Sequence, residues 1–193
     1  MPGSVVLCAV AVAGMLAAEY RDSRGGLWLT KPLASAAFVW LGLAVGALDS
    51  GYGRLVLLAL ALCLLGDILL IPRDRPQVFR AGVFAFLLGH VAYSAAFLSR
   101  PLAPGGFVVG AIVLGVVILA VLRWLGKFVP ADMAGAVRTY MLVIGVMSAL
   151  ACGVTAAGGP WAVAVGALAF AASDISVMIS LMRKLLAKRE DRL

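Results

Sequence analysis

The sequence predicts an all-α protein, a polytopic membrane bundle of about seven transmembrane helices that forms a single domain over residues 1–193. The first observation is composition, because 64% of the residues are hydrophobic and only 13% are charged. The second is the recurrence of apolar stretches close to the roughly 20 residues that cross a bilayer as a helix. The third is that short segments rich in Gly, Pro or charge separate these stretches. A soluble domain of this length does not have enough interior to hide so much apolar surface.

The predicted spans follow one another with almost nothing between them. The first is short and ends at Ala17 and Ala18 as a signal peptide would, but it lacks a basic start and further apolar stretches follow, so we interpret it as a span. The breaks are RDSRGG, DSGYG, PRDRPQ, SRPLAPGG, LGKFVPAD and AAGGP, and no internal repeat is evident. The seven predicted spans are residues 3–18, 32–48, 55–71, 81–99, 102–122, 134–156 and 160–182.

The net charge of +7 predicts an orientation. With these spans, 14 of the 16 basic residues lie on one side, and only Arg54 and Arg100 lie on the other. The positive-inside rule then predicts a cytoplasmic C-terminus and, with seven spans, an external N-terminus. We expect a multi-pass protein of the inner membrane of a bacterial cell. The basic residues are divided among short segments without stacking aromatic residues, so they indicate contact with membrane lipid rather than with nucleic acid.

Several classes of site are excluded by residues that the sequence lacks. Cys8, Cys63 and Cys152 lie in separate spans and are odd in number, which favours packing over a disulfide or metal framework. His90 is the only histidine, so a multi-histidine zinc site is excluded. There is no Gly-x-Ser-x-Gly elbow of a serine lipase and no Lys inside the last span for a retinal Schiff base. We expect neither a metal nor a cofactor.

Two aspartates lie inside predicted spans at similar depths. Asp67 is six residues before Arg73 and Asp174 is nine before Arg183, which places them ~9 Å and ~14 Å from the cytoplasmic ends of their helices. Buried ionisable groups in lipid normally face the bundle interior and find partners there. We therefore expect one cavity that opens toward the cytoplasmic leaflet. Its expected lining is Asp67, His90, Tyr140 and Asp174.

Two interpretations of these acids remain open. Paired carboxylates in a water-poor layer are suited to acid–base chemistry, because burial and neighbouring charges keep one protonated and the other ionised. The competing interpretation is that they only fix helix packing. In that case the expected partners are Lys31 or Arg138 for Asp67, and Tyr140 or His90 for Asp174.

Five motifs resemble those of the YhhN-type lysoplasmalogenase family, and they occur in the family's order from residue 30 onward. The Gly-Asp, Gly-His-x-x-Tyr and Ser-Asp motifs contain Asp67, His90 with Tyr93, and Ser173 with Asp174. Each motif alone is weak, but five in order are fairly specific. The stretches are TKPLA (30–34), LLGDILLIP (64–72), VFAFLLGHVAYSAAFL (83–98), YMLVIGVMSALA (140–151) and GALAFAASDISVMI (166–179).

The resemblance implies an integral membrane hydrolase that cleaves the vinyl-ether bond of lysoplasmalogens to a fatty aldehyde and a glycerophospho-ethanolamine or -choline. It implies that Asp67 and Asp174 are the catalytic acid and base. The matched motifs suggest that His90, Tyr93, Tyr140 and Ser173 contact the lysophospholipid substrate. Lys31 and Arg138 lie where a headgroup phosphate would lie, although simple snorkelling to the interface explains them equally well.

A second function from a different class uses the same residues. A non-catalytic lipid-binding protein, or a proton-coupled lipid carrier, would also need buried acids. A carrier requires access from both faces of the membrane, whereas the predicted acids lie toward one face and the outer half of the bundle is apolar. This difference favours the hydrolase.

Overall fold

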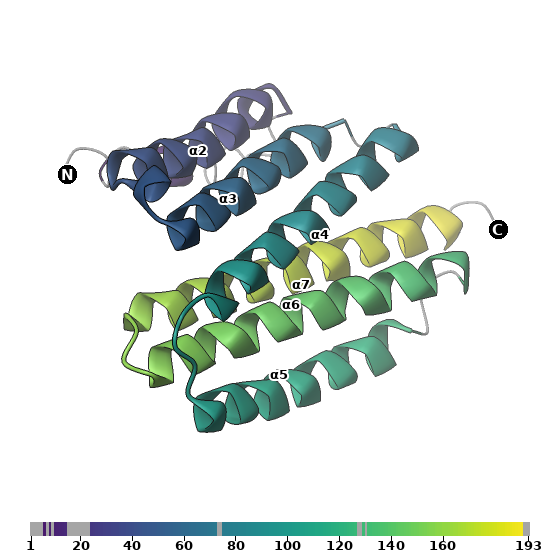
Figure 1. The fold of residues 1–193 in the computed structure, drawn as a ribbon. Helices are drawn as coiled ribbons and strands as arrows, with labels where there is room; N and C mark the ends of the chain where they lie inside the picture. The colour runs from purple at the N-terminus through teal and green to yellow at the C-terminus, as the bar shows by residue number, and fades with distance from the viewer. Residues whose placement is uncertain are drawn as a thin grey trace. The chain divides into compact units, whose positions relative to one another are not determined.

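The computed structural model describes residues 6, 8, 10–14, 24–72, 75–126, 129 and 131–190, with the side chains of residues 24, 25, 27, 131, 132 and 180–190 excepted. Across these ranges the chain is helical and contains no strand, so the all-α prediction is confirmed. The helices in chain order are α2 (Arg24–Ala44), the short 3-10 helix η1 (Ala47–Asp49), α3 (Gly51–Leu69), α4 (Pro76–Leu98), α5 (Pro104–Leu125), α6 (Ala131–Ala156) and α7 (Trp161–Glu190) (Figure 1).

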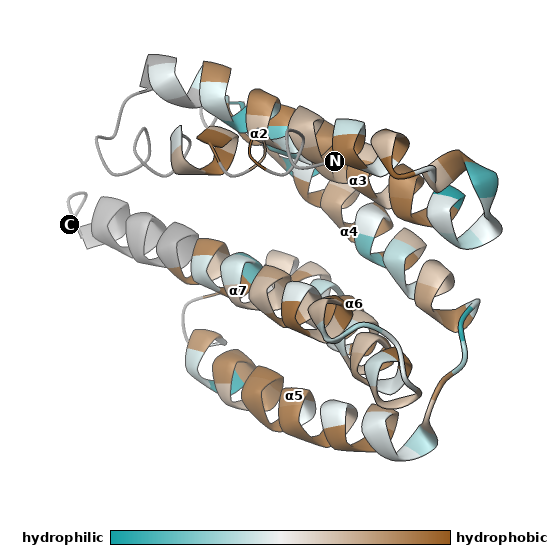
Figure 2. Cartoon of the chain, turned by 90° about the vertical axis from the view of Figure 1, so that its left-hand side faces the viewer, coloured by the Kyte–Doolittle hydropathy of each residue, from teal (hydrophilic) through white to brown (hydrophobic). Residues whose placement is uncertain are grey.

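Five of the described helices, α3 to α7, are long and apolar enough to cross a membrane. Figure 2 shows this apolar character most plainly on α5, whose exposed side chains include Val109, Ile112 and Val116. These helices indicate a multi-pass membrane protein. Residues 6, 8 and 10–14 are helical, but the rest of the first predicted span lies outside the described residues. The count of seven spans, their orientation and the bacterial inner membrane stay predictions.

Local chemistry explains where several helices begin and end. Ser50 caps α3, because its hydroxyl accepts a hydrogen bond from the Gly53 backbone N–H at 3.0 Å. Pro76 and Pro104 occupy the first turns of α4 and α5, where a missing N–H costs nothing. Gly46 and Gly158 have φ values of 80° and 96° in the breaks after α2 and α6, a conformation that L side chains rarely adopt.

The second predicted span was wrong in its bounds. Residues 32–48 were predicted, whereas α2 begins at Arg24 and ends at Ala44. Pro32 lies inside the helix, because one lost backbone bond is tolerated where neighbouring helices and polar side chains compensate. Lys31 therefore lies about 10 Å along α2 from its first residue, and not at the end of a span. At the other end of the chain, α7 continues past the predicted end at residue 182 to Glu190.

The described helices form two compact units, Met1–Ser99 and Arg100–Leu193, which we describe one at a time. In the first unit α3 contacts both α2 and α4, and in the second α6 contacts both α5 and α7. The prediction of one domain over residues 1–193 stays a prediction.

Two glycines allow α3 and α4 to pack closely in the first unit. A Cβ on Gly66 would lie 2.5 Å from the ring of Phe86, and a Cβ on Gly89 would lie 2.9 Å from Cys63 Sγ. Small residues let helices in lipid pack closely, since dispersion forces depend on contact. The packing of α3 against α4 therefore fixes the residues that directly follow these glycines, Asp67 and His90.

Candidate functional site

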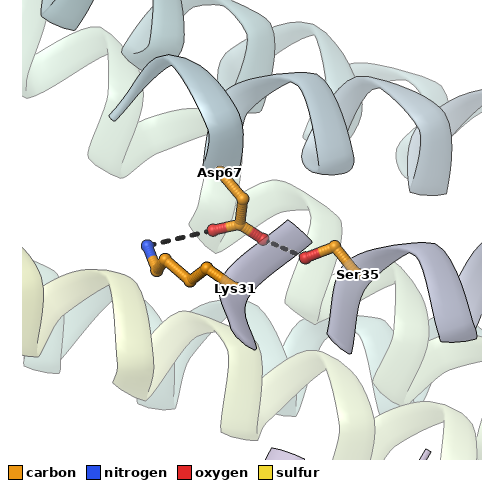
Figure 3. A network of polar contacts seen from close by, with 3 residues as sticks. All are labelled: Lys31, Ser35 and Asp67. Carbon is orange, nitrogen blue, oxygen red and sulfur yellow. Dashed lines mark hydrogen bonds and ion pairs between the residues drawn. The ribbon is translucent and has the colours of Figure 1, made fainter. Parts of the chain in front are cut away.

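Asp67 lies in the last turn of α3 and is held by two side chains of α2 (Figure 3). Lys31 Nζ lies 3.1 Å from Asp67 Oδ1, and the Ser35 hydroxyl donates a hydrogen bond to Asp67 Oδ2. Lys31 and Ser35 are four residues apart and so share one face of α2. Each carboxylate oxygen therefore has its own donor, and the plane of the carboxylate is fixed.

The position of Asp67 explains why it needs a cation. The C-terminal end of a helix carries a partial negative charge, which disfavours a carboxylate in the last turn. Lys31 offsets that repulsion, and the pair is partly buried, with side-chain exposures of 25% for Lys31 and 19% for Asp67. Coulombic attraction is stronger where water is scarce. The Ser35 hydroxyl is the donor in the second contact, because a carboxylate oxygen accepts hydrogen bonds.

These contacts include one of the two predicted partners of Asp67 and add a residue that sequence analysis missed. Asp67 pairs with Lys31, as one of the two alternatives predicted, and Arg138 is an exposed residue of α6 in the other unit. Ser35 was missed because a lone Ser in an apolar helix is usually bonded to its own backbone. The sequence feature that could have identified Ser35 is its spacing of four residues from Lys31, which places both side chains on one face of a helix.

Asp174 has a different environment in the second unit. The Tyr140 hydroxyl of α6 donates to Asp174 Oδ2 of α7 at 2.8 Å, and Tyr140 is one of the two partners predicted for Asp174. Eight residues along α6, the buried Ser148 hydroxyl donates to the Ala167 carbonyl of α7 at 3.4 Å. Both contacts fit one antiparallel register of α6 against α7. Asp174 is half-buried and Tyr140 is buried.

The remaining predicted site residues lie as follows. His90 is fully buried in α4, and because a carbonyl can only accept, its Nδ1–H donates to the Phe86 carbonyl at 2.6 Å. Tyr93 stacks on Phe97, with ring centroids 6.2 Å apart. Ser173 is exposed on α7 beside Asp174. The predicted cavity joins residues of the two units, so it stays a prediction.

An apolar pocket of about 570 Å³ lies elsewhere on α2. Its α2 lining includes Leu33, Ala37 and Trp40, which face residues of the helical segment 10–14. At about 100° per residue, this side of α2 is opposite Lys31 and Ser35. The pocket is therefore separate from the carboxylate site. Among the described residues, no three His, Cys, Asp or Glu side chains gather as a metal site requires.

Fold and site together define a helical membrane protein with two anchored aspartates inside apolar helices. The model of the YhhN family matches residues 26–190, and this chain belongs to that family. The match begins two residues after the start of α2, so the Lys31–Ser35–Asp67 cluster and the Tyr140–Asp174 pair both lie within it. Neither a curated protein nor a solved structure gave a match.

Proposed function

We propose that the protein is a membrane-embedded lipid hydrolase that cleaves the vinyl-ether bond of lysoplasmalogens, giving a fatty aldehyde and a glycerophospho-ethanolamine or -choline. Membership of the YhhN family and the apolar helices support this proposal. The observation that carries it is the match of the YhhN family to residues 26–190, a range that includes both Asp67 and Asp174. Asp67 and Asp174 lie in apolar helices long enough to cross a membrane, where an ionisable residue is by default a candidate for a functional site.

The chemistry of a vinyl ether requires an acid and a base rather than a strong nucleophile. A carboxylic acid gives its proton to the alkene carbon remote from oxygen, which leaves an oxocarbenium ion. A carboxylate takes a proton from water as the water adds to that ion, and a hemiacetal forms. In the collapse of the hemiacetal, the second carboxyl group gives the proton it took from water to the leaving glycerol oxygen, and the first takes the hemiacetal hydroxyl proton. The C–O bond breaks to give the aldehyde and the glycerol hydroxyl, and both carboxyl groups return to their starting states. Positioned acids and bases each contribute roughly 100-fold or more to such steps.

The two aspartates suit the two roles in different ways. Asp67, beside the Lys31 ammonium, suits the carboxylate that stabilises the oxocarbenium ion and activates water. Asp174, whose oxygen accepts from the neutral phenol of Tyr140, suits the acid. We assign the roles accordingly. The proposal requires both carboxyl groups to reach one substrate molecule.

Release of aldehyde by the purified protein tests the proposal. The full chain in detergent is given a lysoplasmalogen, and a lysophospholipid with a saturated ether link is the control substrate. Aldehyde from the first and none from the second supports a vinyl-ether hydrolase. Saturable binding of both lipids without any turnover would contradict the proposal and favour the lipid-binding or carrier function.

A further inference from the structure

We propose that Ser35 is a positioning residue for catalysis, and that it acts by fixing the Asp67 carboxylate beside Lys31. The inference rests on the proposed function, because it gives Asp67 a catalytic role. Ser35 lies on the same face of α2 as Lys31. Its hydroxyl donates a hydrogen bond to Asp67 Oδ2, while the Lys31 ammonium forms an ion pair with Asp67 Oδ1 (Figure 3). The two contacts hold opposite ends of one carboxylate.

A carboxylate held at one oxygen alone can still turn. The bond between the β-carbon and the carboxyl carbon of Asp is a broad torsion with shallow wells, so a single ion pair does not define the plane of the group. The Ser35 contact supplies the second point that defines it. Each oxygen has a second lone pair, so one hydrogen bond at each leaves capacity to accept a proton from water.

The geometry of α2 makes this contact specific. Several other hydroxyls in the described helices bond the backbone of their own helix, as Thr30 does to the Gly26 carbonyl at 2.8 Å and Ser94 does to the His90 carbonyl at 2.9 Å. That is the usual behaviour of Ser and Thr inside a helix. Ser35 instead reaches across to α3, 32 residues away in sequence. The Ser35 hydroxyl therefore positions the Asp67 carboxylate and does not stabilise the backbone of α2.

The first test separates positioning from binding. Ser35→Ala removes the donor, and we expect kcat to fall roughly tenfold or more, the scale for losing a hydrogen bond to a charged group, while KM changes less than twofold. Ser35→Thr keeps the hydroxyl and is expected to restore kcat to within about threefold of the parent. Ser94→Ala is the matched control, since Ser94 is equally part-buried but bonds its own helix, and its kcat is expected to stay unchanged.

The second test does not depend on turnover. Dicyclohexylcarbodiimide modifies protonated carboxyl groups in apolar surroundings, and mass spectrometry of the Asp67 peptide measures that modification. We expect Asp67 to be modified several-fold faster in Ser35→Ala than in the parent. The rate in Ser94→Ala should equal that of the parent, and residue 67 of Asp67→Asn should not be modified. Should Ser35→Ala fail to fold, Ser35→Cys, which keeps the size but has a weak donor, replaces it.

These outcomes distinguish the inference from the proposed function. If no variant or parent releases aldehyde, the proposed function fails and the modification rate alone decides the role of Ser35. If Asp67→Asn is inactive while Ser35→Ala keeps kcat within twofold of the parent, the inference is overturned and the function stands. An unchanged modification rate in Ser35→Ala, or failure of Ser35→Thr to restore kcat, overturns the inference as well.

Discussion

Asp67 and Asp174 are both aspartates in apolar helices, yet their surroundings differ in charge. Asp67 ends α3 and contacts a cation and a hydroxyl of α2, whereas Asp174 lies within α7 and accepts from a phenol of α6. A cation favours the ionised form of a carboxyl group more strongly than a neutral donor does. In the proposed mechanism this difference in partners is the basis for assigning the base role to Asp67 and the acid role to Asp174.

Loss of either carboxyl group should have the largest effect. Asp67→Asn and Asp174→Asn are each expected to cut turnover at least ~100-fold, the usual scale for a positioned acid or base. The double variant should be little worse than either single one, because groups that act on one step are not additive. Aldehyde release by folded protein measures this. Turnover within threefold of the parent in either single variant would show that the replaced aspartate only stabilises helix packing and is not catalytic.

Loss of the Lys31 charge should remove the difference between the two sites, because Asp67 would then have only a neutral hydrogen-bond donor, as Asp174 has. In Lys31→Met the carboxyl group in the last turn of α3 loses its counter-charge, and turnover is expected to fall roughly 10- to 100-fold. Lys31→Arg keeps the charge and should retain more activity. Equal activity in both variants would show that the charge of Lys31 is not what Asp67 requires.

A methyl group on Gly66 should disturb Asp67 through packing. Its Cβ would lie 2.5 Å from the buried ring of Phe86, so Gly66→Ala is expected to destabilise the fold by about 1–3 kcal/mol, as overpacking does. Gly115→Ala is the control, because nothing lies within 4 Å of a Cβ there. Thermal unfolding in detergent measures both. A melting temperature equally unchanged in the two variants would contradict the close α3–α4 contact.

Loss of the Tyr140 hydroxyl should have the smallest effect. Tyr140→Phe removes a neutral donor from Asp174 and is expected to lower turnover roughly 3- to 10-fold, the scale of an ordinary hydrogen bond. A loss larger than that of Lys31→Met, measured by the same assay, would reverse our ranking of the two sites. Asp174 would then depend on its partner more than Asp67 does.

The sequence by itself determined the membrane class, most of the helices and the two aspartates. Spans predicted at 102–122 and 134–156 agree closely with α5 and α6, because a long apolar run in lipid must satisfy its backbone within one helix. An acid inside such an apolar run is also easy to recognise in the sequence, because the free-energy cost of placing a carboxylate in lipid makes such residues rare. The family motifs around Asp67 and Asp174 were also readable from sequence.

Only the tertiary structure decided which partners those acids have. The start of α2 was missed because Gly and Pro disfavour a helix locally, while packing against α3 lies outside any sequence window. The contacts of Lys31 and Ser35 with Asp67 depend on how α2 is rotated about its axis relative to α3. A side chain 32 positions away becomes a neighbour only when helices pack, and hydrogen bonds depend on that final geometry.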